Sequence, residues 1–212
     1  MRRERSSSRD ALSITTGDKM ELNKTVSNPM LVGAMQLIKS DGKEPVPEHQ
    51  ALFMEQLDKA ELLAPADVKG ELDENGQIPA EGKVLVRFPY LFGSDGKKFV
   101  VVFTDNASLE KAKAVEGPSR LPDEYLKNCA VLKLLDLAKM VFVKNPDGSD
   151  NDTFGIVINP FMENIVIPRG SIEQITRRKM EAAKTAMEKA AQRAGVTEGG
   201  QVIQFPGAKN NE

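Results

Sequence analysis

The sequence contains one histidine and one cysteine, so it offers few side chains for metal binding or nucleophilic catalysis. His49 stands beside Glu48 with no second histidine to complete a metal motif or a catalytic pair. Cys129 opens an apolar stretch and would act as a nucleophile only if a helix N-terminus or a nearby base lowered its pKa. We therefore predict a solvent-exposed helical histidine, a buried strand cysteine and no catalytic residue.

Two polar loops resemble ligand-binding motifs without meeting their requirements. A calcium loop needs a glycine at its sixth position and an acidic ligand at its twelfth. Counted from Asp147, those positions hold Asp152 and Ile158. The glycines of Gly93–Lys97 are too close together for a phosphate-binding loop. We predict a solvated acidic loop and a hairpin turn, and neither a metal nor a cofactor.

Large apolar side chains occur next to two predicted turns. Such groups either fold back onto the core, which is the commoner outcome, or form an exposed patch that a protein partner covers. Two methionines of a predicted C-terminal helix are further candidates. The candidate partner surface consists of Tyr90, Phe92, Phe161, Met162, Met180 and Met187.

The C-terminal helix has a small apolar seam and an excess of basic residues. The 3-4 spacing of the seam would let it dock on the domain or on another helix, and self-association is one form of such docking. Basic residues also suggest a nucleic-acid stripe, but ion-pair spacings such as Lys184 to Glu188 favour a solvated helix. The seam comprises Met180, Ala183, Met187, Ala190 and Ala194.

Amphipathic patterns predict the helices that would position these residues. Asn28-Pro29 predicts a helix start, with the Asn28 side chain accepting from free amides at the cap. That helix should end at Ser40-Asp41-Gly42. A second helix is predicted to follow Pro47. Three more are predicted over 108–116, 134–143 and 171–194.

Short β-branched and aromatic runs predict strands, several of them joined as hairpins. The runs cover 62–68, 84–88, 99–103, 129–132, 154–158 and 165–167. Asp95-Gly96 suits a type I′ turn, and the run 99–103, apolar on both faces, predicts a central strand. The fold class is α+β: a single domain with a mixed or antiparallel sheet packed by helices.

Composition limits the kinds of partner. With 29 basic and 31 acidic residues among 212, the net charge is −2, which does not favour nucleic acid or an anionic membrane. The longest apolar run, 99–103, is too short to span a bilayer. A single cysteine suits the reducing cytoplasm. We predict a disordered lead over 1–21, a domain over 22–176, a helical extension over 177–195 and a flexible tail over 196–212.

Four segments, in order, resemble the N-terminal domain of the SseB, or enhanced serine sensitivity, family. They are the Asn28-Pro29 helix, ALFMEQLDKAELLAP from Ala51, FPYLFGSDGKKFVVVFTD from Phe88 and FGIVINPFMENIVIP from Phe154. The resemblance covers about residues 22 to 176. It implies an α+β domain of the bacterial cytoplasm, and the family name records a serine-sensitivity phenotype rather than a reaction.

Together these observations favour a non-enzymatic module that binds a protein partner through a few apolar anchors such as Phe161 and Met162. The alternative is a small-ligand-binding protein or enzyme connected with amino-acid or sulfur metabolism, whose site is built from residues distant in sequence. The family's serine phenotype suggests this alternative, and no residue pattern locates its site.

Overall fold

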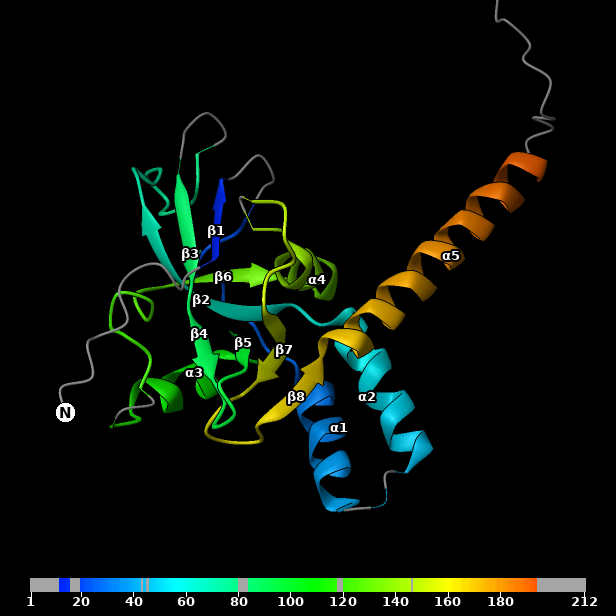
Figure 1. The fold of residues 1–212 in the computed structure, drawn as a ribbon, viewed down its shortest axis with the longest axis horizontal. Coiled ribbons are helices and arrows are strands. Elements are labelled where there is room, and N and C mark those ends of the chain that lie inside the picture. The colour runs from blue at the N-terminus through cyan, green and yellow to red at the C-terminus, as the bar shows by residue number, and fades with distance from the viewer. Residues whose placement is uncertain are drawn as a thin grey trace, which may run out of the picture. The chain divides into compact units, whose positions relative to one another are not determined.

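A computed structural model of the protein describes residues 12–15, 20–42, 44, 46–79, 84–117, 120–145 and 147–193; for residues 12–15 and Arg193 it describes the backbone alone. The chain divides into two compact units, Met1–Glu173 and Gln174–Glu212. The first contains two sheets and four helices, together with the start of a fifth (Figure 1). The α+β class is confirmed.

The first sheet is antiparallel and has the strand order β1-β3-β2-β6. The alternating Leu-Ser-Ile-Thr of β1, which lies within the segment predicted as a disordered lead, pairs with β3, with Leu12 opposite Phe88. The rest of residues 1–19 lies outside the described residues, as does the tail. The strands are β1 (Leu12–Thr15), β2 (Leu62–Lys69), β3 (Leu85–Phe88) and β6 (Asn128–Leu132).

The second sheet is mixed, with the order β4-β5-β7-β8. Its two outer pairs are antiparallel hairpins, whereas β5 and β7 run parallel, so the predicted central position of β5 is confirmed. Leu63 of β2 exchanges two backbone hydrogen bonds with Phe103 and thereby joins the sheets. The strands are β4 (Tyr90–Phe92), β5 (Lys98–Val102), β7 (Thr153–Ile158) and β8 (Ile165–Pro168).

Three turns share one local geometry. In each, the backbone oxygen of the first residue accepts from the amide of a glycine three positions later. The amide of the first residue donates to the backbone oxygen of the residue that follows this glycine. The glycines have left-handed φ values of +70°, +78° and +82°. This is the three-residue loop that ends in a left-handed glycine, so the type I′ prediction for Asp95-Gly96 is wrong. The turns are Asp73–Gln77, Gly93–Lys97 and Asn145–Ser149.

Two helices cover the two faces of the mixed sheet, and two others pack against each other as a pair. Leu109 and Ala112 of α3 join Val101 and Val157 in one buried cluster. Because side chains alternate along a strand, the opposite face of β5 and β7 is left for α4. Helices α1 and α2 pack side by side (Figure 1). The helices are α1 (Pro29–Ser40), α2 (Pro47–Lys59), α3 (Asn106–Lys113), α4 (Leu134–Phe142) and α5 (Arg169–Arg193).

The start of α1 differs from the sequence prediction. Pro29 occupies the first turn as predicted, but the Asn28 side chain makes no cap bond. Its Nδ2 instead donates to the backbone oxygens of Glu61 and Thr104, at 2.7 and 2.6 Å. Asn28 therefore ties the start of α1 to both sheets, because those carbonyls lie next to β2 and beyond β5.

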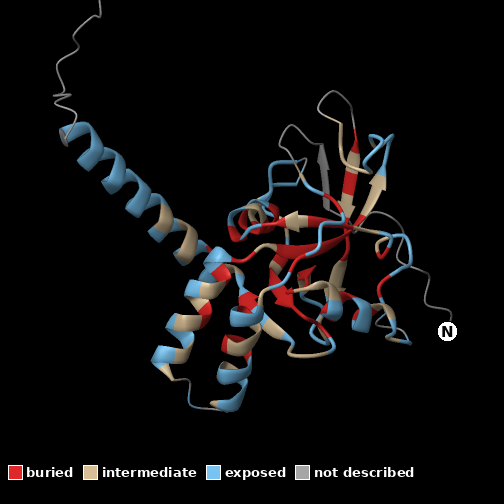
Figure 2. Cartoon of the chain, turned by 180° about the vertical axis from the view of Figure 1, so that it is seen from behind, coloured by how far each residue is buried: buried red, intermediate tan, exposed pale blue. Residues whose placement is uncertain are grey.

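None of the helices described by the structure has the length and apolar character required to cross a membrane. The longest, α5, is strongly polar, and its residues from Glu181 to Gln192 are all exposed (Figure 2).

Candidate functional site

An open groove of about 460 Å³ lies on one face of the mixed sheet. It runs from the β4–β5 turn to the β7–β8 turn and draws residues from all four strands. Most of the lining is apolar. The lining residues are Leu91, Phe92, Gly93, Ser94, Asp95, Phe99, Val157, Pro160, Phe161, Asn164 and Val166.

The floor of the groove is the part of a sheet face that no helix covers completely. Leu91 is paired with Phe99 across β4 and β5, and Val157 with Val166 across β7 and β8. This is the same face on which Val101 packs against α3. Val166 is 42% exposed, so the face is buried at one end and open at the other.

One wall of the groove is the β7–β8 turn, whose backbone is strained. Asn159, Phe161 and Asn164 all have left-handed φ values, of +48°, +73° and +55°. Asparagine tolerates this region, but a bulky residue such as phenylalanine does so at a cost. Phe161 nevertheless remains 38% exposed, so the turn presents an aromatic ring at the groove rather than burying it.

A buried polar network fixes this turn. Asn159 is fully buried, and its Oδ1 accepts from the Thr104 amide at 2.9 Å. Its Nδ2 donates to the Thr104 hydroxyl and to Glu163, also at 2.9 Å. The Asn159 backbone oxygen accepts from the amides of Met162 and Asn164. These bonds over-determine the turn and hold Phe161 in its strained conformation.

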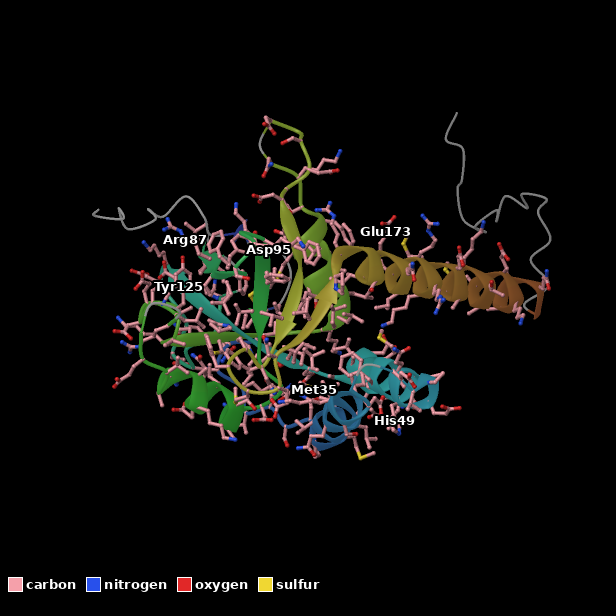
Figure 3. All side chains as sticks on the ribbon, turned by 60° about the horizontal axis from the view of Figure 1, so that its bottom comes forward. Met35, His49, Arg87, Asp95, Tyr125 and Glu173 are labelled. Carbon is pink, nitrogen blue, oxygen red and sulfur yellow. The ribbon has the colours of Figure 1, made fainter. Side chains whose placement is uncertain are left out.

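The opposite wall is the β4–β5 turn, which carries Asp95 (Figure 3) and its partner Lys97. The ammonium and the amide of Lys97 both donate to the Asp95 carboxylate, and these bonds hold its pKa below the usual value. The same ammonium lies 4.3 Å from the centroid of the Phe154 ring. Phe154 in turn meets Phe99 edge to face at 5.4 Å. The charge of this wall is thus balanced.

The structure brings together two of the predicted surface residues and separates the others. Phe92, which is 51% exposed, and Phe161 line the groove. Tyr90 is half-buried, with its hydroxyl 3.4 Å from that of Thr153, and burial raises its pKa. Met162 packs against the buried cluster. The remaining two, Met180 and Met187, belong to the second unit.

Several lining residues were not predicted. The sequence pattern places Phe99, Val157 and Val166 only on strands, because their common face depends on which strands pair. Alternation within each strand was visible in the sequence, but the parallel pairing of β5 with β7 was not.

His49 is not the freely exposed residue predicted from the sequence. His49 lies on α2 (Figure 3). Its Nδ1 lies 2.7 Å from Oδ1 of Asp41, whose side chain is 5% exposed. Oδ2 of Asp41 also accepts from the Val46 amide. Burial alone would raise the pKa of Asp41, but these hydrogen bonds outweigh it and lower the pKa. The pair closes the connection between α1 and α2, so its role is structural.

Cys129 is buried in the α3 cluster, as predicted. Burial raises the pKa of its thiol to about 11. At pH 8 about one such thiol in a thousand is ionised, against about one in four for an unperturbed cysteine. Such a group is a poor nucleophile.

We expect Cys129 to react with Ellman's reagent at least 100-fold more slowly in the native protein than in urea at pH 8, because both ionisation and access are restricted. Absorbance at a series of pH values measures this, and the native rate should keep rising up to about pH 10. Equal native and unfolded rates would show that the thiol is accessible.

Within the described ranges, no three His, Cys, Asp or Glu side chains form a group that could hold a metal ion. The acidic segment from Asp147 instead helps to build a hairpin turn, in which Asp147 Oδ1 accepts from the amide and hydroxyl of Ser149.

A family model described as the SseB protein N-terminal domain matches residues 35–174, which is more than half of the chain and includes the whole groove. No curated protein and no solved structure matches the chain.

Proposed function

The chain belongs to the family of the SseB protein N-terminal domain, and on that premise we propose that the domain is a protein-interaction module. Its groove receives an extended segment of a partner protein. Phe161 and Phe92 provide the apolar contacts at the two walls, and the partner covers the open sheet face around Val166.

The observation that carries this proposal is the exposed, left-handed Phe161. A left-handed backbone costs a residue with a side chain roughly 1–2 kcal/mol. A buried aromatic residue would offset that cost through the packing of its ring, but Phe161 is 38% exposed. Strain of this kind concentrates at binding and catalytic sites. When a partner buries the ring, the free energy gained from that burial offsets the cost of the left-handed backbone, which the isolated domain does not offset.

The lining of the groove favours a peptide over a small molecule. Its volume of about 460 Å³ lies within the usual range for small-ligand sites. Such sites, however, hold a few convergent polar groups that fix the ligand. Here the polar side chains of Ser94, Asp95 and Asn164 are all exposed at the rim. One or two bulky apolar side chains of a peptide suit this arrangement.

Substitution of Phe161 should separate binding from stability. Glycine adopts a φ of +73° without strain, so we expect Phe161→Gly to be more stable than Phe161→Ala by about 1 kcal/mol. Within helices and strands the order is usually the opposite, and alanine gives the more stable protein. Both variants should bind the partner at least 30-fold more weakly, the loss of about 2 kcal/mol that defines an interface hot spot. Urea unfolding measures the first effect and titration of the partner the second.

The partner can be identified by crosslinking from a photo-reactive residue placed at a chosen position in the groove. A photo-reactive phenylalanine analogue at position 161, and separately at 92, should crosslink the same protein in the cells that produce the chain. The analogue at Leu135 is the matched control, because Leu135 is 42% exposed but lies on α4, away from the groove. The captured protein is then titrated against the Phe161→Gly and Leu135→Ala variants.

Equal crosslinking from positions 161 and 135, or unchanged affinity of Phe161→Gly, would refute the interaction site. A rise in melting temperature with amino acids or sulfur metabolites would instead favour the small-ligand alternative. A ligand at about 100 times its Kd contributes about 2.7 kcal/mol to the free energy of unfolding.

A further inference from the structure

The mixed sheet has two edges, β4 and β8, which differ in the backbone groups that they expose (Figure 1). The Asn159 amide donates to β5, so Ile158, one residue earlier, faces β8 and its partner there, Ile165. The outward-facing residues of β8 are therefore Val166 and Pro168, and proline has no N–H to donate. The β8 edge thus offers few groups with which another strand could pair.

The edge of β4 is not protected in this way. The Gly93 amide donates to the Lys97 oxygen at 2.9 Å, so Gly93 faces β5, and by alternation Leu91 does too. The N–H and C=O groups of Tyr90 and Phe92 therefore point away from the sheet. In the part of the chain that the structure describes, none of these four groups has a hydrogen-bond partner. Sheet edges are often protected by a charge or a proline, and β4 contains neither.

We propose that the β4 edge pairs with the same edge of a second copy of the chain, in an antiparallel dimer with its twofold axis at Leu91. Tyr90 of each copy then lies opposite Phe92 of the other. Both positions are of the hydrogen-bonded type, so the pairing satisfies all four outward-facing backbone groups of each copy. This proposal goes beyond the one made for the groove and does not rest on it.

The side chains of β4 suit this pairing. Both hydrogen-bonded pairs are aromatic, and aromatic pairs stabilise neighbouring strands. Leu91 meets Leu91 of the second copy at a non-hydrogen-bonded position, where side chains approach most closely. Because β4 has no charged residue, no like charges meet across the axis. An unrelated strand would have to supply both aromatic partners, whereas a second copy supplies them by symmetry.

The dimer closes on itself, which favours it over open-ended assembly. It uses both β4 edges, and the edges that remain are the two β8 strands with Pro168. Leu91 also lines the groove. Pairing would therefore join two four-stranded sheets into one, with the grooves of both copies on the same face.

The first test is sedimentation velocity of the full chain over a range of concentrations. The pairing involves three residues per copy, so we expect a weak, reversible dimer with a dissociation constant between the micromolar and millimolar ranges. Phe92→Pro removes an outward N–H and breaks no bond within the sheet. By symmetry it removes two of the four hydrogen bonds between the copies, and it should weaken the dimer at least tenfold.

Ser94→Pro is the matched control. Ser94 follows the edge and occupies the second position of a turn in which the Gly93 oxygen accepts from the Gly96 amide, a position that proline prefers. This variant should leave the dissociation constant within twofold of the parent value. Both proline variants should keep the melting temperature of the parent, which shows that they are folded.

Amide exchange tests the pairing without any substitution. The Tyr90 and Phe92 amides should exchange at least tenfold more slowly in the dimer than in the monomer. The Leu91 amide, which faces β5 in both states, should exchange at the same rate. In cells, the photo-reactive analogue at position 92 should give a crosslinked dimer of the chain, and the analogue at position 161 should not.

Several results would overturn the proposal. A chain that is still monomeric at about 1 mM would refute the dimer. Equal effects of Phe92→Pro and Ser94→Pro would place the interface elsewhere. Protection of the Tyr90 and Phe92 amides in the monomer would show that the chain itself covers this edge, and protection only after addition of the protein captured at the groove would assign the edge to that partner. Phe161→Gly should leave dimerisation unchanged, so failure of the dimer does not bear on the groove.

Discussion

Gly155→Ala should destabilise the protein by about 3 kcal/mol, a loss near the upper end for overpacked cores. Gly155 lies in β7, and a Cβ atom placed there would be 2.1 Å from the backbone oxygen of Ile167 in β8. Backbone atoms of Pro168 and Ile167 lie at 3.0 and 3.1 Å, so no side-chain rotation relieves the contact. The β8 strand must move away from β7, and the hairpin that carries Phe161 must move with it.

Urea unfolding and thermal unfolding both measure this loss, and the melting temperature should fall by roughly 6–12 °C for a chain of this size. Gly33→Ala is the matched control. Gly33 lies inside α1 with no atom near its would-be Cβ, so alanine there should stabilise the helix by about 0.5–1 kcal/mol. A Gly155→Ala variant as stable as the parent would refute the close approach of β8.

The second large effect is expected at Asn159. Replacement by alanine removes the acceptor of the buried Thr104 amide and the donor to the Thr104 hydroxyl. A buried polar group left without its partner costs about 1–3 kcal/mol. Alanine also tolerates the left-handed backbone less well than asparagine does, at a further cost of about 1 kcal/mol. We expect Asn159→Ala to lower the free energy of unfolding by about 2–4 kcal/mol.

Two companion variants separate these causes. Asn164 has the same left-handed backbone but an exposed side chain, so Asn164→Ala should show the backbone cost of about 1 kcal/mol alone. Asn159→Asp keeps an acceptor for the Thr104 amide but places a second carboxylate beside Glu163. Repulsion between the two carboxylates should destabilise this variant at neutral pH, and its stability relative to the parent should rise on acidification. Equal stability of Asn159→Ala and Asn164→Ala would show that the network contributes nothing.

Local sequence signals predicted much of the fold. Six predicted strands and five predicted helices are present, because alternation and amphipathic spacing are properties of a single segment. Where the geometry of a turn was wrong, as at Asp95-Gly96, the position of the turn was right. The exceptions are Leu12–Thr15 and Tyr90–Phe92, short segments that become strands because β3 and β5 offer them pairing edges. The role of Asn28 was missed for a similar reason, since Glu61 and Thr104 reach it from distant segments.

The candidate site was less predictable than the fold. Phe92 and Phe161 were identified from apolar residues beside turns, a local signal. Their proximity depends on the parallel pairing of Lys98–Val102 with residues 153–158, a contact between distant segments. The strain at Phe161 was also invisible, because the turn is fixed in part by the bonds of Asn159 to Thr104, a residue distant in sequence.

The central position of β5 also has a consequence for how the protein is made. Its apolar stretch from Phe99 to Val102 leaves the ribosome about fifty residues before β7, the strand that completes its pairing. Until then one side of β5 is a bare hydrophobic edge, the kind of surface that recruits other strands and promotes aggregation. Pairings between distant segments also form slowly. During biosynthesis of this domain the edge of β5 is therefore open to wrong pairing until β7 has been made.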